Sequence, residues 1–117
     1  MDARHTRRIK VVQELYSTFF SPLPKTADQL SHKITQKAPE LDIYIDEFAS
    51  KFQSDRIAKV DLAILRLALF ELLHEKETPY KVVINEAVDL AHEMGGENSP
   101  AFVNAVLGKA HEKIAKN

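Results

Sequence analysis

The sequence predicts an all-α protein, a compact bundle of about six helices built around one strongly apolar segment. Strand signals are absent: apolar and polar residues do not alternate over any sustained run, and the 117 residues include only three glycines. Apolar residues recur instead at helical spacing, separated by cap-and-proline pairs that start helices. No repeat, low-complexity tract or long linker divides the chain, so we expect a single domain over residues 1–117.

The segment that organises this bundle is residues 59–74. Between Val60 and Leu73 only Asp61, Arg66 and Glu71 are polar, and at about 100° per residue they point in three different directions. A helix that is apolar on all sides must be covered on all sides, and this one is shorter than the ~20 residues that cross a bilayer. We therefore expect a buried central helix whose charges have partners, because an unpaired buried charge costs several kcal/mol.

Three helices are expected before this segment. The first runs over residues 4–20 and stops at the following prolines, which cannot extend it. The second covers residues 26–37, and the third covers residues 39–52 with its proline in the first turn. Ser54 or Asp55 can then cap the central helix.

Two helices are expected after it. Thr78 and the proline that follows it predict a helix over residues 79–94. Gly95-Gly96 ends this helix, since glycine adopts the left-handed conformation at little cost. Ser99 and its proline repeat the same start signal for a last helix over residues 100–115.

The composition excludes several functional classes. There is no cysteine for disulfides or thiolate metal sites, and the five histidines lack metal-ligand spacing. No P-loop, nucleophile elbow or dinucleotide-binding glycine pattern occurs. We expect a protein that is not an enzyme and that uses no metal or cofactor. The charged start, without an apolar leader, predicts a cytoplasmic protein.

Basic residues gather at the start of the chain. The net charge is −1, yet the first ten residues have a balance of +3, with Arg4, Arg7, Arg8 and Lys10 against Asp2. Basic side chains at a helix start oppose the helix dipole, so their presence indicates an anionic partner. The alternative is that these side chains only keep the chain end soluble.

Four motifs in order carry a family resemblance. They are RHTRRIKVVQELY (4–16), VDLAILRLALFEL (60–72), TPYKVVINEAVDLA (78–91) and SPAFVNAVL (99–107). Together they resemble the NusB family of bacterial transcription antitermination factors. Residues 21–37 show no convincing match, and the chain is shorter than is usual for the family.

The resemblance implies a fold of two packed helical sub-bundles, with the N-terminal one shortened. It also implies binding of boxA-like single-stranded RNA from ribosomal leaders, together with a small-subunit ribosomal protein called NusE in this role. This pair joins RNA polymerase in an antitermination complex. Two alternatives remain: a helical protein-interaction module without RNA binding, and an RNA-recruiting domain of a ribosomal RNA methyltransferase, which requires a chain longer than this one.

The expected RNA contacts are of two kinds. Basic side chains neutralise phosphates without reading sequence, whereas aromatic and amide side chains stack on bases or bind their edges. The resemblance places five of them where the first helix meets the start of the last one: Arg7, Arg8, Tyr16, Phe102 and Asn104. Asn98, in the loop before the last helix, is a further possible contact. The predicted RNA-binding residues are Arg4, Arg7, Arg8, Lys10, Tyr16, Asn98, Phe102 and Asn104.

Some of these assignments have structural alternatives. Tyr16 and Phe102 also fit the apolar stripes of their helices, so core packing remains open for both. Ala105 stands where the family commonly has glycine, which would reduce a close approach to RNA. Asp61, near a helix start, is the expected exposed contact for the protein partner. Arg66 and Glu71 are expected to pair internally, for instance with Glu86 and Lys81.

Overall fold

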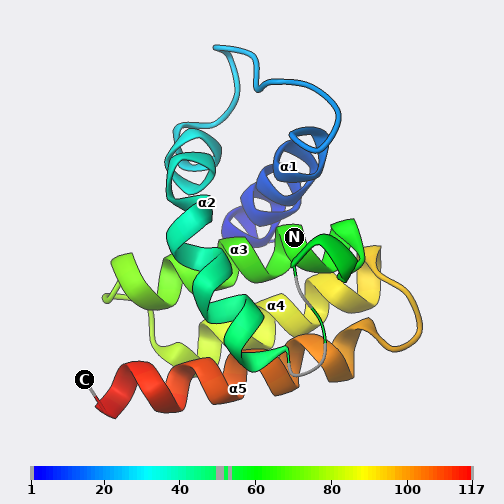
Figure 1. The fold of residues 1–117 in the computed structure, drawn as a ribbon. Coiled ribbons are helices and arrows are strands. Elements are labelled where there is room, and N and C mark those ends of the chain that lie inside the picture. The colour runs from blue at the N-terminus through cyan, green and yellow to red at the C-terminus, as the bar shows by residue number, and fades with distance from the viewer. Residues whose placement is uncertain (1, 50–51, 53, 117) are drawn as a thin grey trace.

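A computed structural model describes residues 2–49, 52 and 54–116, which form five α-helices, one short 3₁₀ helix and no strand. In chain order these are α1 (Ala3–Ser17), α2 (Gln29–Phe48), η1 (Ser54–Arg56), α3 (Lys59–His74), α4 (Tyr80–Met94) and α5 (Ser99–Lys116) (Figure 1). The all-α prediction is confirmed, with five α-helices in the described part instead of about six. No helix among these residues is long and apolar enough to cross a membrane.

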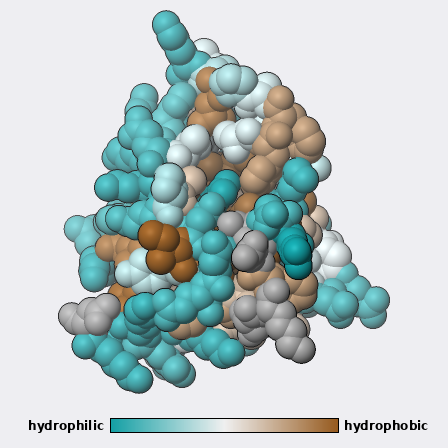
Figure 2. Space-filling model, viewed as in Figure 1, coloured by the Kyte–Doolittle hydropathy of each residue, from teal (hydrophilic) through white to brown (hydrophobic). Residues whose placement is uncertain are grey.

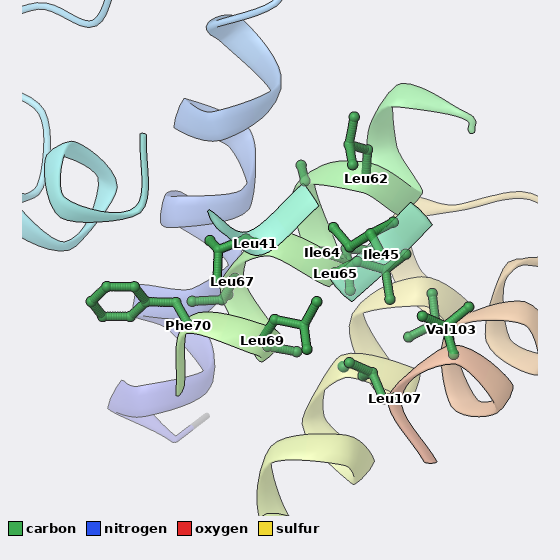
Figure 3. Close-up of a cluster of buried hydrophobic side chains, with 14 of the residues drawn as sticks. Leu41, Ile45, Leu62, Ile64, Leu65, Leu67, Leu69, Phe70, Val103 and Leu107 are labelled. Carbon is green, nitrogen blue, oxygen red and sulfur yellow. The ribbon is translucent and has the colours of Figure 1, made fainter. Parts of the chain in front are cut away.

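Helix α3 is the centre of the fold, as the sequence predicts. Of its 16 residues 11 are buried, and it contacts each of the other four α-helices. In Figure 1, α3, α4 and α5 run roughly along one another, whereas α1 and α2 lie across them. Figure 3 shows α3 side chains meeting those of α2 and α5 in one apolar cluster. Burying each leucine-sized side chain stabilises the fold by about 1.5–3 kcal/mol.

Two charges of α3 pair with helices other than α4. Arg66 makes a two-pronged bond to Asp42 of α2, with N–O distances of 2.9 and 2.7 Å, and its guanidinium lies 5.3 Å from the ring centre of Phe19. Glu71 pairs with Arg8 of α1. The predicted partners on α4 were wrong because periodicity shows that a face is covered, not which neighbour covers it.

The predicted break between the second and third helices does not exist. Residues 26–37 and 39–52 were assigned to two helices, but α2 continues from Gln29 to Phe48 with Pro39 inside it. A proline here removes one backbone hydrogen bond. The buried stripe that includes Leu41 and Ile45 runs past Pro39, and its packing on α3 keeps the helix continuous.

Several helix ends also differ from the predictions, among them those of α2, which begins at Gln29 and ends at Phe48 where residues 26 and 52 were predicted. α1 ends at Ser17, and the residues up to Phe20 form turns. The expected caps at residues 54 and 55 belong to η1, and α3 starts after Ala58 without a side-chain cap. Pro79, not Thr78, takes the cap position of α4. Caps are local and weak, so tertiary packing shifts these ends by a few residues.

Candidate nucleic-acid interface

The basic start of the chain folds into the first turns of α1. Asp2 caps this helix, its carboxylate accepting a hydrogen bond from the Arg4 N–H at 3.1 Å. Arg4 and Lys10 are exposed, and neither forms an ion pair with any residue that the structure describes. These two side chains are therefore available to an anion.

Arg8 instead holds α1 against the core. Its side chain is only 11% exposed, and it donates two hydrogen bonds to Glu71, at 3.0 and 2.7 Å, and one to Glu86 at 3.0 Å. The hydrogen bonds with Glu71 raise the pKa of Arg8 above its usual value. His5 extends the network to α4, lying 3.3 Å from Glu86 and 2.9 Å from Glu93. Arg8 can reach a phosphate only by giving up these partners.

Arg7 forms an ion pair, as Arg8 does, but its side chain stays largely exposed. Its guanidinium donates two hydrogen bonds to Asp28, at 2.9 and 2.8 Å, while the side chain stays 57% exposed. The pairing with Arg7 lowers the pKa of Asp28 to about 2. Because Asp28 also caps α2 by accepting from the Leu30 N–H at 2.9 Å, this pair fastens α2 to α1. The exposed part of Arg7 can still attract an anion.

A second group of predicted residues surrounds two adjoining hollows where α3 and α5 begin. The larger hollow, about 500 Å³, is bordered by Phe52, Asn98 and Phe102, and the smaller one, about 340 Å³, by Tyr16. The hollows share Ala58, Asp61, Gly96 and Ser99, and together they form what we term the aromatic groove. Three of the predicted RNA contacts therefore meet along one concave surface.

The aromatic side chains of the groove are partly exposed and held by other rings. Tyr16 is 38% exposed, and its ring lies 5.4 Å from that of Phe20. Phe102 is half-buried against the core and meets Phe52 edge to face, with ring centres 5.9 Å apart. The core-packing alternative thus applies to part of each side chain. Exposed ring surface remains, and aromatic faces of this kind stack on nucleobases.

Gly95 brings the end of α4 and the start of α5 close together. A Cβ atom at Gly95 would lie 2.6 Å from Ser99 Cβ and 2.8 Å from the Ala91 carbonyl oxygen, so no larger residue fits without a shift. The Gly96 N–H donates to Ser99 Oγ at 2.9 Å. The predicted left-handed conformation was wrong, since Gly95 has φ −93° and ψ −169°. Close approach, not a positive φ, requires this glycine.

Asp61 differs from the expectation of an exposed acid. It lies in the first turn of α3 but is only 7% exposed, at the boundary between the two hollows. Its Oδ1 atom has no hydrogen-bond partner among the described residues. A partner protein could therefore reach Asp61 only with a side chain that enters the groove.

Most of the predicted residues consequently fall into two groups instead of one, and Lys10 and Asn104 border neither. Arg4, Arg7 and Arg8 line a separate hollow of about 260 Å³, beside the end of α3. Arg8 and Tyr16 are eight residues apart, about 12 Å along α1. Asn104 is exposed on α5 and does not border the groove.

Sequence reasoning missed three residues of the groove. Phe52, the last residue of the predicted third helix, is 48% exposed, and Arg56 and Lys59 add positive charge beside it. The basic residues just before the apolar segment were the available signal.

Figure 2 shows a mainly hydrophilic face with small apolar patches. Within residues 2–49, 52 and 54–116, no group of three His, Asp or Glu side chains could hold a metal ion.

Comparison with known proteins gives consistent matches. Residues 5–112 match the model of the NusB family, a range that includes residues 21–37. The transcription antitermination protein NusB of Agathobacter rectalis is 49% identical over 82 residues, which is 70% of this chain and 63% of that protein. The protein of the same name from Alkaliphilus oremlandii is 44% identical over 86 residues, 70% of this chain and 62% of that protein.

A solved structure agrees with these sequence matches. The NusB structure from T. maritima superposes with a TM-score of 0.85 at 29% identity, covering 96% of this chain and 92% of that one. In the sequence alignments, by contrast, the chain spans less than two thirds of the length of the two curated relatives above.

Proposed function

Because the chain belongs to the NusB family, we propose that it is a non-catalytic RNA-binding factor of transcription antitermination. The observation that carries the proposal is the aromatic groove, in which Tyr16, Asn98 and Phe102 surround one concave surface. Single-stranded RNA is recognised by stacking its bases on aromatic rings and by hydrogen bonds to base edges. A groove with two exposed ring systems and an amide suits this kind of ligand.

The basic side chains of α1 complement the groove. Arg4 and Lys10 are exposed without ion pairs among the described residues, and Arg7 is more than half exposed. Such side chains bind phosphates and release counterions, which strengthens binding without selecting sequence. We propose that the RNA backbone follows this part of α1 while bases occupy the groove, with Arg56 and Lys59 as further phosphate contacts beside it.

The proposed RNA is a boxA-like single strand from ribosomal leaders, bound together with the ribosomal protein NusE in an antitermination complex with RNA polymerase. These partners follow from the family relationship. The predicted contact of NusE at Asp61 requires a partner side chain in the groove, since Asp61 is buried. Asn104 is proposed as an RNA contact outside the groove, on the exposed side of α5.

A fluorescence anisotropy titration tests this proposal with a labelled boxA-like RNA and a scrambled RNA, each with and without NusE. We expect tighter binding of the boxA-like RNA, and a further increase when NusE is present. Absence of RNA binding under every condition, with binding of NusE retained, would favour the protein-interaction module instead.

Salt dependence tests the phosphate contacts. Replacing Arg4 and Lys10 together by alanine should reduce the slope of log K against log salt by about 1.4, because each phosphate contact to a single strand contributes about 0.7. The matched control replaces Lys33 and Lys37, two exposed lysines of α2, and changes the net charge equally. An equal loss of slope in both double variants would show that overall charge, and not α1, attracts the RNA.

A further inference from the structure

One acidic side chain lies among the basic residues of α1 that the RNA is proposed to contact. Asp28, just before α2, accepts two hydrogen bonds from Arg7, one from Nε at 2.9 Å and one from Nη2 at 2.8 Å. The hydrogen bond from Arg7 is the main cause that lowers the pKa of Asp28, and the charge of Lys10 contributes to the same shift. Arg7 and Lys10 are three residues apart and share a face of α1. Asp28 therefore lies where these two residues would attract a phosphate.

The hollow beside the end of α3 has a similar balance of charge. Three arginines and two glutamates border it: Arg4, Arg7, Arg8, Glu71 and Glu75. Asp28 adds a third carboxylate through its bonds to Arg7, and Glu86 adds a fourth through its bond to Arg8. These acids offset the arginines, so an anion that approaches α1 competes with carboxylates of the protein itself.

The pair of Arg7 and Asp28 can exchange partners more readily than that of Arg8 and Glu71. The side chain of Arg7 is 57% exposed, whereas that of Arg8 is 11% exposed. Asp28 takes the Nε and Nη2 edge of the guanidinium, an edge that also binds phosphate in a two-pronged way. The Nη1 atom of Arg7 bonds no residue that the structure describes. A phosphate can thus approach Nη1 first and then replace the carboxylate.

The start of α2 has other contacts that do not involve Arg7. The Asp28 carboxylate caps α2 by accepting a hydrogen bond from the Leu30 N–H at 2.9 Å. Glu14 of α1 accepts hydrogen bonds from the Asp28 N–H at 3.0 Å and from the Ser31 hydroxyl at 2.7 Å. Release of Arg7 therefore leaves both the cap of α2 and a second contact between α2 and α1 in place.

We propose that Asp28 is an internal competitor of the RNA at Arg7: the carboxylate holds the guanidinium in the free protein, and a phosphate of the bound strand takes its place. This inference rests on the proposed RNA-binding function and adds an autoinhibitory contact to the same site. The affinity of α1 for RNA is then lower than its basic residues alone would give. Removal of the carboxylate should make RNA binding tighter.

The test titrates a labelled boxA-like RNA against Asp28→Asn by fluorescence anisotropy at several salt concentrations. Asparagine caps a helix about as well as aspartate, so α2 keeps its start. We expect binding about fivefold tighter than that of the wild type, the effect of removing one unit charge at contact distance in water. The slope of log K against log salt should become steeper by up to about 0.7, because the phosphate no longer displaces an internal anion from Arg7.

Two controls assign the gain to this pair. Glu75→Gln removes the same charge from the hollow, but Glu75 is exposed and forms no ion pair within the described part of the chain. It should change the affinity by less than about twofold, since solvent and salt screen its charge, and it should leave the slope unchanged. In an Arg7→Ala background, Asp28→Asn should also change the affinity by less than about twofold, because the contested cation is absent.

NMR of the unaltered protein gives a readout that does not depend on the folding of a variant. The Arg7 Nε–H signal should shift as the RNA is added, because its acceptor changes from carboxylate to phosphate. The Arg8 Nε–H signal should stay unchanged, since Arg8 remains bonded to Glu71. An Arg7 signal that does not shift at saturating RNA would overturn the inference.

Other outcomes would also overturn the inference without affecting the proposed function. One is RNA binding by Asp28→Asn that is no tighter than that of the wild type. Another is a gain in affinity that Glu75→Gln reproduces, or that persists in the Arg7→Ala background, since overall charge would then explain it. Absence of RNA binding by the unaltered protein, in contrast, would overturn the proposed function itself.

Discussion

Replacing Arg8 by alanine should destabilise the protein far more than any other change to the basic start of α1. Arg8 is the cation that faces Glu71 of α3 and Glu86 of α4, and its side chain is almost buried. Its removal leaves the buried carboxylate of Glu71 without a counter-charge and takes one of its two partners from Glu86. His5 remains beside Glu86 but not beside Glu71.

The expected magnitude is about 3 kcal/mol, at the lower end of the 3–5 kcal/mol measured when one partner of a buried ion pair is removed. This is a large fraction of a typical free energy of unfolding of 5–15 kcal/mol. For a chain of this size, it corresponds to a decrease in Tm of about 12 °C. Replacing Arg8 and Glu71 together by methionine should recover most of the loss, because neither charge then remains buried alone.

Urea unfolding followed by far-ultraviolet circular dichroism measures these differences, provided that the m value stays constant. Arg4→Ala is the matched control, since Arg4 is exposed and forms no ion pair within the described part of the chain; it should change stability by less than about 0.5 kcal/mol. A loss below about 1 kcal/mol for Arg8→Ala would refute the reasoning. A double methionine variant no more stable than Arg8→Ala would refute it as well.

Three further predictions concern other parts of the fold. Gly95→Ala should destabilise by about 1–3 kcal/mol in urea unfolding, because the new Cβ overlaps Ser99, whereas Gly108→Ala, with no atom within 4 Å of its Cβ, should be neutral or stabilising. The pKa of His5 is raised mainly by its hydrogen bond to Glu93 and also by Glu86. The difference in free energy of unfolding between the wild type and His5→Gln should therefore be fully present below pH 6.5 and disappear as the pH rises through the raised pKa. The pKa of Asp28 is lowered to about 2, so we expect Asp28→Asn to lose roughly 1 kcal/mol at pH 5, after allowance for solvent screening. This difference should shrink as the pH falls below about 4 and disappear as it falls through 2. Equal free energies of unfolding for the two glycine variants would contradict the first assignment. For His5→Gln and Asp28→Asn, a stability–pH profile parallel to that of the wild type would contradict the other two.

The sequence was most informative where burial surrounds a helix completely. The apolar run of α3 predicted a central, covered helix, and the structure confirms this with 11 buried residues. The same reasoning placed α4 and α5 within one or two residues of their observed bounds, because glycine and proline signals agree there with the apolar stripe. At Pro39 the two signals disagree, and the stripe prevailed.

The candidate site was predictable in its residue types but not in its arrangement. Of the five residues that the family resemblance places together, Tyr16 and Phe102 border one groove. Asn104 lies outside that groove, and Arg7 and Arg8 face acidic partners elsewhere. A basic side chain near a chain end has the same sequence signature whether it faces solvent or a buried carboxylate. Which of these holds depends on the neighbouring helix.

By itself, the sequence determined that this protein is helical, which helix lies at its centre and which family it resembles, since each of these follows from local spacing and order along the chain. Only the tertiary structure decided which charges neutralise one another, that Arg8 is a structural cation and that the Oδ1 atom of Asp61 is buried without a hydrogen-bond partner among the described residues. The physical reason is that periodicity reports how much of a helix is covered, while pairing depends on the position and direction of helices distant in sequence.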